Sequence, residues 1–208
     1  MPNIFSDDYI EIKDDPFIID MMYANNTNNM TGIETYNKIG LGNRAFVHIE
    51  LWKKLKNVIP YLKEKNLKMK ICDAYRPPIA HEIMKKIIPT PGYFAADPAR
   101  SPHCRAIAID VCLCHPNGTE LKYPTKVDAY TPYYAKKIQS GDFTEFEQYL
   151  KKVHHDYQDP TIPEEIKNRN ELRTLMENAE LKILPIEWWH YNLADREHYT
   201  NYPIVEFD

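Results

Sequence analysis

The sequence predicts an α+β domain built on a small, largely antiparallel sheet that is flanked by helices. Strand-like and helix-like segments follow one another irregularly, without the steady alternation of a parallel α/β fold. Residues 107–114 alternate as a strand does and lead through a hairpin-type turn, His115–Thr119, into a short returning strand. No repeat, low-complexity tract or linker divides the 208 residues, so we expect one domain over 1–208.

The first part of the chain, about residues 1–32, is expected to be an extended arm. Within it, Asp14–Pro16 is typical of a turn and Phe17–Ile19 of a short strand. Residues 25–29, four asparagines and a threonine, indicate a polar loop.

Two helices and a strand are expected after the arm. Asn43 is a candidate N-cap for the first helix, which Pro60 must kink or end. Its apolar residues at helical spacing are Leu51, Leu55, Val58 and Leu62. Lysines alternate with apolar residues over 67–71, which favours a half-buried strand, and Pro77–Pro78 begin the next helix.

The second half of the chain begins with two proline-containing loops, 89–102 and 124–132. The first delivers His103, and the second contains Asp128. Two helices are then expected, with Phe143, Phe146, Leu150 and Val153 in one and Pro163, Ile166, Leu172, Leu175 and Met176 in the other. A last strand is expected from about Leu181 to Leu193.

Composition excludes several classes of partner. With 26 Lys and Arg against 30 Asp and Glu, the net charge of −4 favours neither a nucleic acid nor an anionic membrane surface. No apolar run reaches the roughly 18 residues of a membrane span, and Met1–Asp8 lacks the features of a signal peptide. The cysteines, Cys72, Cys104, Cys112 and Cys114, show no disulfide spacing, so we expect reduced thiols and a cytoplasmic location. The oligomeric state is left open.

Two short clusters carry the chemistry, Ser101–Asp110 and Glu187–His190. Two histidines and an aspartate, namely His103, His190 and Asp110, form a neutral-plus-anionic ligand set that suits Zn²⁺ and leaves one position for water. Glu187 has no apolar or turn-forming role at its position. A carboxylate beside a metal-bound water is the proton carrier that a metallohydrolase needs.

The spacing within both clusters requires kinks in the backbone. His103 and Asp110 are seven residues apart, which places them on opposite faces of a strand and about 10 Å apart along a helix. His103 must therefore lie on a loop that bends back before the strand begins. Glu187 and His190 meet only across a bulge or a single helical turn.

Each of these residues also has a simpler interpretation. A lone histidine is usually a surface or hydrogen-bonded core residue, and we retain that interpretation for His48, His81, His115, His154, His155 and His198. Cys104 would be a soft zinc ligand, but adjacent residues rarely converge on one ion. Asp110 could cap or pair with a neighbour, Arg76 could be a solvated turn residue, and Trp188 and Trp189 are more often core than site. Taken singly, these interpretations prevail.

Taken together, the segments resemble a known family. Asp73–Pro77, the pattern Ser101-x-His103-x4-Ala108-x-Asp110 and Glu187–His190 are similar to the zinc D-alanyl-D-alanine dipeptidases of the VanX type. Weaker similarities lie at Tyr23–Gly32, Asp128, Asn168–Arg169 and Met176–Glu177. The resemblance extends from about residue 17 to the end of the chain, and its motifs are specific for the wider group of zinc D-peptidases.

The resemblance implies a catalytic zinc site. His103, Asp110 and His190 would bind Zn²⁺, and Glu187 would be the general base. Arg76 would stabilise the charge that develops on the attacked carbonyl oxygen. The family usually has glycine where this chain has Ala106, in the required bend. If the bend needs a positive φ, alanine would cost about 1 kcal/mol there.

The substrate implied is a small dipeptide whose two termini are both recognised. Asp128 would pair with the free ammonium, whereas Ser101 would hold a polar substrate group or only stabilise its loop. Two alternatives stay open. One is a D,D-carboxypeptidase or cell-wall endopeptidase of the same group, although no export signal or wall-binding repeat accompanies the motifs. The other is a zinc-stabilised binding domain without activity, which would have no use for Glu187 and Arg76.

Overall fold

The computed structural model describes residues 1–26, 29, 31–88, 94–129, 134, 136, 137 and 140–207. Parts of three expected loops lie outside these ranges: residues 27 and 28, residues 89–93 and residues 130–132.

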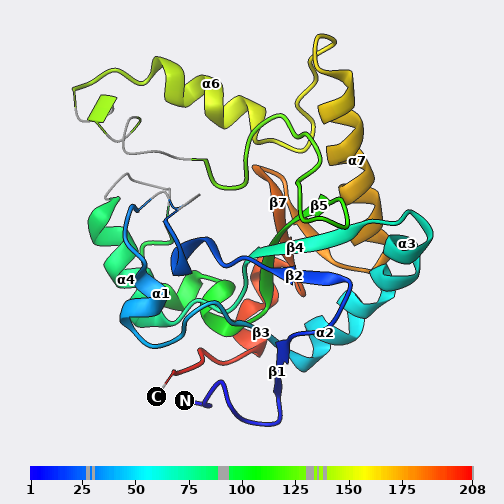
Figure 1. The fold of residues 1–208 in the computed structure, drawn as a ribbon. Coiled ribbons are helices and arrows are strands. Elements are labelled where there is room, and N and C mark those ends of the chain that lie inside the picture. Colours follow the sequence, from blue (N-terminus) through cyan, green and yellow to red (C-terminus); the bar gives the residue numbers. More distant parts are fainter. Residues whose placement is uncertain are drawn as a thin grey trace.

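A five-stranded sheet lies at the centre of the molecule, in the strand order β2-β4-β5-β7-β6 (Figure 1). The strands are β2 (Phe17–Ile19), β4 (Lys68–Asp73), β5 (Ala108–Cys114), β6 (Lys182–Leu184) and β7 (Glu187–Asn192). The pair β2 and β4 is parallel, and the other three neighbouring pairs are antiparallel. The predicted α+β class with a largely antiparallel sheet is confirmed.

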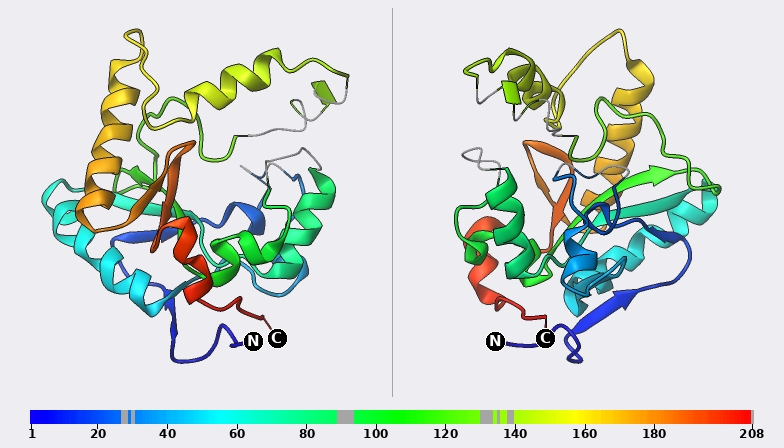
Figure 2. Two further views of the ribbon diagram at one scale, coloured as in Figure 1. Left: turned by 180° about the vertical axis from the view of Figure 1, so that it is seen from behind. Right: turned by 60° about the vertical axis from the view of Figure 1, so that its left-hand side comes forward.

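The N-terminal arm contributes a strand to each of two sheets. Its first strand, β1 (Tyr9–Ile12), pairs antiparallel with β3 (Ala45–His48), and the expected strand β2 lies beside β4. A 3₁₀ turn η1 (Met22–Ala24) and a short helix α1 (Thr35–Lys38) follow. The two ends of the chain meet, since the Ile4 amide donates to the Glu206 carbonyl over 3.0 Å (Figure 2).

The prediction that Asn43 caps a helix is wrong. Its Oδ1 accepts from the Met21 amide (2.8 Å) and its Nδ2 donates to the Ile19 carbonyl (3.0 Å). These main-chain groups of the arm compete for the Asn43 side chain and fasten the arm to the body of the protein. The helix α2 (Ile49–Leu55) begins later, where Nδ1 of His48 accepts from the amide of the second helical residue over 3.1 Å.

Pro60 interrupts the helical segment, as expected. After α2 the chain passes through a 3₁₀ turn, η2 (Lys56–Val58), into a separate helix α3 (Ile59–Glu64). Pro60 occupies the first turn of α3, where a backbone N–H has no helical acceptor and its loss costs nothing.

The other long helices appear where apolar spacing predicts them: α4 (Pro78–Ile87), α6 (Thr144–Lys152) and α7 (Pro163–Asn178). Helix α7 packs against β5, β6 and β7 (Figure 2). The buried face of α6 differs in part from the expected one. Phe146, Tyr149 and the following Val153 are buried, whereas Phe143 and Leu150 are exposed.

The single strand expected over 181–193 is wrong, because β6 and β7 form a hairpin around Pro185 and Ile186. Proline ends pairing on β6 because it has no N–H to donate. In the hairpin, Leu184 faces Glu187 but Ile183 faces Tyr191, so residues 188–190 bulge out of register. Of the two geometries expected for Glu187 and His190, a bulge or a helical turn, the structure has the bulge.

Both faces of β5 are buried, so its seven residues are all core. Asp110 therefore lies on one buried side of the strand, and Ile109 and Val111 lie on the other. Trp188 and Trp189 are also buried, which confirms their assignment to the core. All four cysteines are free thiols, as predicted, and all four are buried.

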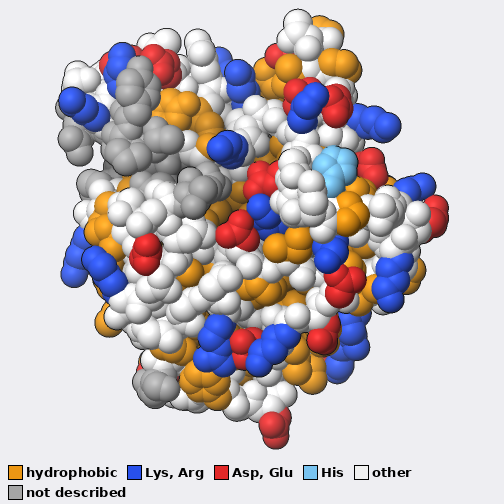
Figure 3. Space-filling view, viewed as in Figure 1, with side chains coloured by type: hydrophobic (Ala, Val, Ile, Leu, Met, Phe, Trp, Pro, Cys, Tyr) orange, Lys and Arg blue, Asp and Glu red, His pale blue; other side chains and the backbone are white. Residues whose placement is uncertain are grey.

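The surface carries charges of both signs. On the face drawn in Figure 3, basic and acidic side chains lie interspersed. Among the described residues, no helix has the length and apolar character needed to cross a membrane.

Candidate active site

Three chain segments bring His103, Asp110 and His190 together. Asp110 on β5 lies directly opposite His190 on β7 in the antiparallel register. His103 begins the 3₁₀ turn η4 (His103–Arg105) that precedes β5. All three are buried, and one potential ligand atom from each lies within 4.8 Å of the others. Within the described part of the chain, this is the one such group of His, Cys, Asp or Glu found.

The bend between His103 and Asp110 exists and has a positive φ. Ala106 ends η4 in the left-handed region, at φ 56° and ψ 26°. Its amide donates to the His103 carbonyl (3.0 Å), and the Ile107 amide donates to the Pro102 carbonyl (3.1 Å). This reversal places His103 beside Asp110, which confirms the bend predicted from their spacing.

Ala106→Gly is expected to raise the stability of the chain by about 1 kcal/mol, because glycine adopts this conformation without the steric cost of a Cβ. Thermal unfolding measures the effect. The matched control is Ala108→Gly, which removes the same methyl group from a buried strand position and should lower the melting temperature. If both substitutions lower it equally, the alanine at the bend is not strained.

Hydrogen bonds set which nitrogen of His103 faces the ligand set. Its Nδ1 lies 2.7 Å from the Ala74 carbonyl, which can only accept, so Nδ1 carries the proton. Nε2 is then the nitrogen that faces the ligand set, and it lies 3.2 Å from Nδ1 of His190 and 3.5 Å from an Asp110 carboxylate oxygen. The other nitrogen of His190, Nε2, lies 2.9 Å from Oδ1 of Asn192.

The charge of Asp110 suits a cation. Burial alone would raise the pKa of this carboxyl, but the charges and hydrogen bonds of His103 and His190 outweigh burial and hold it well below its usual range. The pKa of His103 shifts in the opposite direction to that of Asp110. Burial lowers the pKa of His103, but the Asp110 carboxylate raises it above the ordinary histidine value. Asp110 is therefore an anion inside a buried pocket.

Glu187 begins β7 at the mouth of the same pocket. Its Oε2 lies 3.7 Å from Nδ1 of His190, and its side chain is 32% exposed. Burial of the carboxyl, aided by the charges of Asp110 and Asp128, raises its pKa to about 7, against the opposing effects of His190 and Arg76. A carboxyl with this pKa exchanges protons near neutral pH.

Arg76 is held rigidly at the pocket wall. Its Nε and Nη2 donate to one oxygen of Asp73 at 3.0 and 2.6 Å. The other oxygen of Asp73 accepts from the Tyr36 hydroxyl at 2.6 Å and from the Ala74 amide at 3.0 Å. The guanidinium also lies over the Tyr23 ring, 5.3 Å from its centroid. A buried, paired guanidinium of this kind keeps its charge and its position.

The pocket has a volume of about 230 Å³ and brings together all the residues singled out in the sequence, which are Arg76, Ser101, His103, Asp110, Asp128, Glu187 and His190. Asp128 adopts φ 49° and accepts from the Tyr23 hydroxyl over 2.7 Å. Ser101 is buried in the wall. His81, treated above as an ordinary histidine, also lines this pocket, and its Nε2 lies 2.9 Å from the Ala95 carbonyl.

Several residues of the site were missed in the sequence. Asp73 lies three residues before Arg76, a spacing that could have suggested the pair. Asn192 lies two residues after His190, so a strand places both on one face. Arg100, Arg196 and Tyr199 also line the pocket, and nothing in the local sequence marks them.

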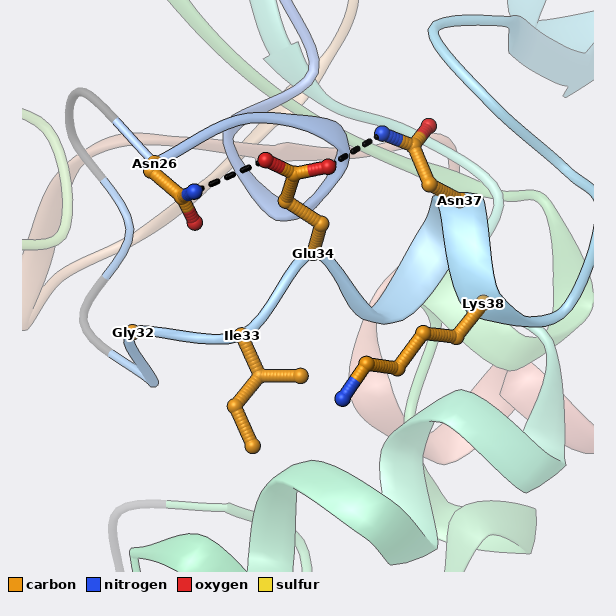
Figure 4. Close-up of a pocket in the computed structure, with 6 residues that line it drawn as sticks. All are labelled: Asn26, Gly32, Ile33, Glu34, Asn37 and Lys38. Carbon is orange, nitrogen blue, oxygen red and sulfur yellow. Dashed lines mark hydrogen bonds between the residues drawn. The ribbon is translucent and has the colours of Figure 1, made fainter.

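A second pocket, of about 430 Å³, lies at α1 and carries no comparable chemistry (Figure 4). Its carboxylate, Glu34, accepts from Nδ2 of Asn26 (2.8 Å) and from Nδ2 of Asn37 (2.7 Å). Both oxygens are thus engaged by neutral amides, and the labelled lining offers no histidine. The candidate site is the pocket around His103, Asp110 and His190.

Comparison with known proteins agrees with the motifs. The chain matches the family model Peptidase_M15, described as D-ala-D-ala dipeptidase, over residues 8–208. It is also similar to the D-alanyl-D-alanine dipeptidase of Escherichia coli (strain K12), with 25% identity over 187 residues that cover 90% of this chain and 82% of that protein. The chain therefore belongs to the Peptidase_M15 family, as its resemblance to the D-Ala-D-Ala dipeptidases implied.

Proposed function

We propose that this protein is a zinc-dependent dipeptidase that hydrolyses D-Ala-D-Ala, with Glu187 as general base. The observation that carries the proposal is the convergence of His103, Asp110 and His190 in one buried group, with Glu187 beside it in the same pocket. The family model and the similarity to the D-alanyl-D-alanine dipeptidase of Escherichia coli support the substrate class.

The donor set fits a zinc ion. His103 presents Nε2 to the ligand set, since its other nitrogen donates to the Ala74 carbonyl, and Asp110 supplies one negative charge. Three N and O donors are typical of a catalytic zinc site that keeps one position open. When bound, Zn²⁺ would polarise the peptide carbonyl and lower the pKa of a water molecule to about 7.

Glu187 moves the proton. Its carboxylate accepts a proton as water attacks the peptide carbonyl and later gives it to the leaving amine. A pKa of about 7 suits both steps, because the group must gain and lose a proton in one turnover. The position of Glu187 at the mouth of the pocket, partly exposed, gives it access to water.

Arg76 stabilises the negative charge that develops on the carbonyl oxygen. Its guanidinium stays charged throughout the reaction and lines the pocket that holds His103 and Asp110. Because Asp73 and the Tyr23 ring already fix it, little reorganisation is needed when the charge appears.

The ammonium end of the substrate is recognised by a residue of opposite charge. Asp128 lines the pocket and pairs with the free ammonium, and Ser101 holds a polar group of the substrate. The pocket is small, about 230 Å³, which favours a short substrate.

We expect free D-Ala-D-Ala to be cleaved, and N-acylated D-Ala-D-Ala or a pentapeptide ending in D-Ala-D-Ala to lose about 10²-fold or more in kcat/KM. An N-terminus that is acylated or extended brings no positive charge to the Asp128 carboxylate, so the ion pair made by the free dipeptide is lost. Steady-state kinetics on the three substrates measures the ratio of kcat/KM for the free dipeptide to kcat/KM for each of the other two. The Asp128→Asn substitution should lower this ratio. If the pentapeptide is cut as well as the dipeptide, the protein is a D,D-carboxypeptidase instead.

A further inference from the structure

Asn192 lies behind His190, on the side away from the other two ligands. The two residues are two positions apart on β7, so their side chains project from the same face. Oδ1 of Asn192 lies 2.9 Å from Nε2 of His190, and Asn192 is 3% exposed. A buried contact of this length is a full hydrogen bond sheltered from water.

Asn192 is fixed within the sheet. Its backbone is paired on both sides, with Ala108 of β5 and with Lys182 of β6. Tyr199, on η5 (Arg196–Asn201), lines the same pocket. The side-chain amide of Asn192 presents its carbonyl oxygen, Oδ1, to His190.

This oxygen fixes a proton on one nitrogen of His190. An amide oxygen can only accept, so Nε2 of His190 donates to it, and Nδ1 is the nitrogen left to face the ligand set. Nδ1 is the nitrogen beside the other ligands, 3.2 Å from Nε2 of His103. Asp110 acts in the opposite direction, because its carboxylate oxygen lies 2.9 Å from Nδ1 and favours a proton there.

We propose that Asn192 is a positioning residue that holds His190 in the tautomer with a bare Nδ1 and thereby strengthens metal binding. The inference rests on the metal site of the proposed function. Without Asn192, Asp110 would draw the proton to Nδ1, and a metal ion would have to displace it. His103 obtains the same help from the backbone carbonyl of Ala74, which no side-chain substitution can remove. Asn192 is therefore the part of this outer shell that mutation can test.

The test is the affinity of the metal-free chain for Zn²⁺, measured by competition with a chromophoric chelator. Asn192→Leu keeps the size of the side chain but accepts no hydrogen bond, and it should weaken zinc binding 10–100-fold. Asn192→Asp restores an acceptor and should bind zinc within a few-fold of wild type or more tightly. The matched control is Asn168→Leu, which removes a buried asparagine that donates to the Lys122 carbonyl and should leave zinc affinity unchanged.

Two results would overturn the inference: Asn192→Leu binding zinc within threefold of wild type, or Asn192→Asp losing as much affinity as Asn192→Leu. Should the variants not fold, ¹⁵N NMR of the metal-free wild type at alkaline pH decides, since a proton on Nδ1 of His190 contradicts the proposal and a proton on Nε2 supports it. A wild-type chain that binds no zinc would refute the proposed function as well. Zinc binding without hydrolysis of D-Ala-D-Ala would refute that function alone.

Discussion

Glu187→Gln is expected to lower kcat for D-Ala-D-Ala by about 10²–10⁴-fold while the chain keeps its metal and its fold. Glutamine is nearly the same size and still forms hydrogen bonds, so packing beside Trp188 should survive. It cannot accept the proton of the attacking water. Because the base acts in the transition state and scarcely on substrate binding, the loss should appear in kcat and not in KM.

The purely structural role of Glu187 predicts a different pattern, with a lower melting temperature and unchanged turnover per folded molecule. Measuring metal content, melting temperature and kcat on the same preparation separates the two. Glu34→Gln is the matched control, because Glu34 lies in the second pocket, bonded to Asn26 and Asn37. Turnover of Glu187→Gln within a few-fold of wild type would remove this residue from the mechanism.

His103→Ala and His190→Ala are each expected to abolish retention of the metal and, with it, hydrolysis. Either change leaves two protein ligands, too few for a site that needs three. His115→Ala is the control, since His115 is exposed in the turn after β5 and should matter for neither property. Elemental analysis after dialysis measures the metal. Full metal content in both ligand variants would show that the ion is held elsewhere.

The two kinks of the site could be predicted because each pair of side chains is separated by an odd number of positions along the chain. An odd separation along a strand places His103 and Asp110 on opposite faces, and only a reversal of the chain can bring them together. The structure makes that reversal at Ala106. In the same way, the bulge over 188–190 brings Glu187 and His190 to the same side of the strand.

What could not be predicted depends on contacts between distant segments. Asn43 is a good helix cap by residue type, but its side chain forms hydrogen bonds with the main chain of the arm instead. The pairing of β1 with β3 joins segments more than thirty residues apart, a contact that no local pattern encodes. The β6–β7 hairpin turns at Pro185–Ile186 without the glycine or asparagine typical of tight hairpins. Tyr199 becomes recognisable as a site residue only once the fold brings η5 to the pocket.

The most direct test of the metal site is a single preparation followed through removal and return of the ion. The wild-type chain should carry about one zinc, hydrolyse D-Ala-D-Ala, lose both properties after treatment with a strong chelator, and regain both when Zn²⁺ is restored. The His103→Ala variant should regain neither. Hydrolysis that persists in the chelator-treated chain, with no metal left by elemental analysis, would contradict a metal-dependent reaction at His103, Asp110 and His190.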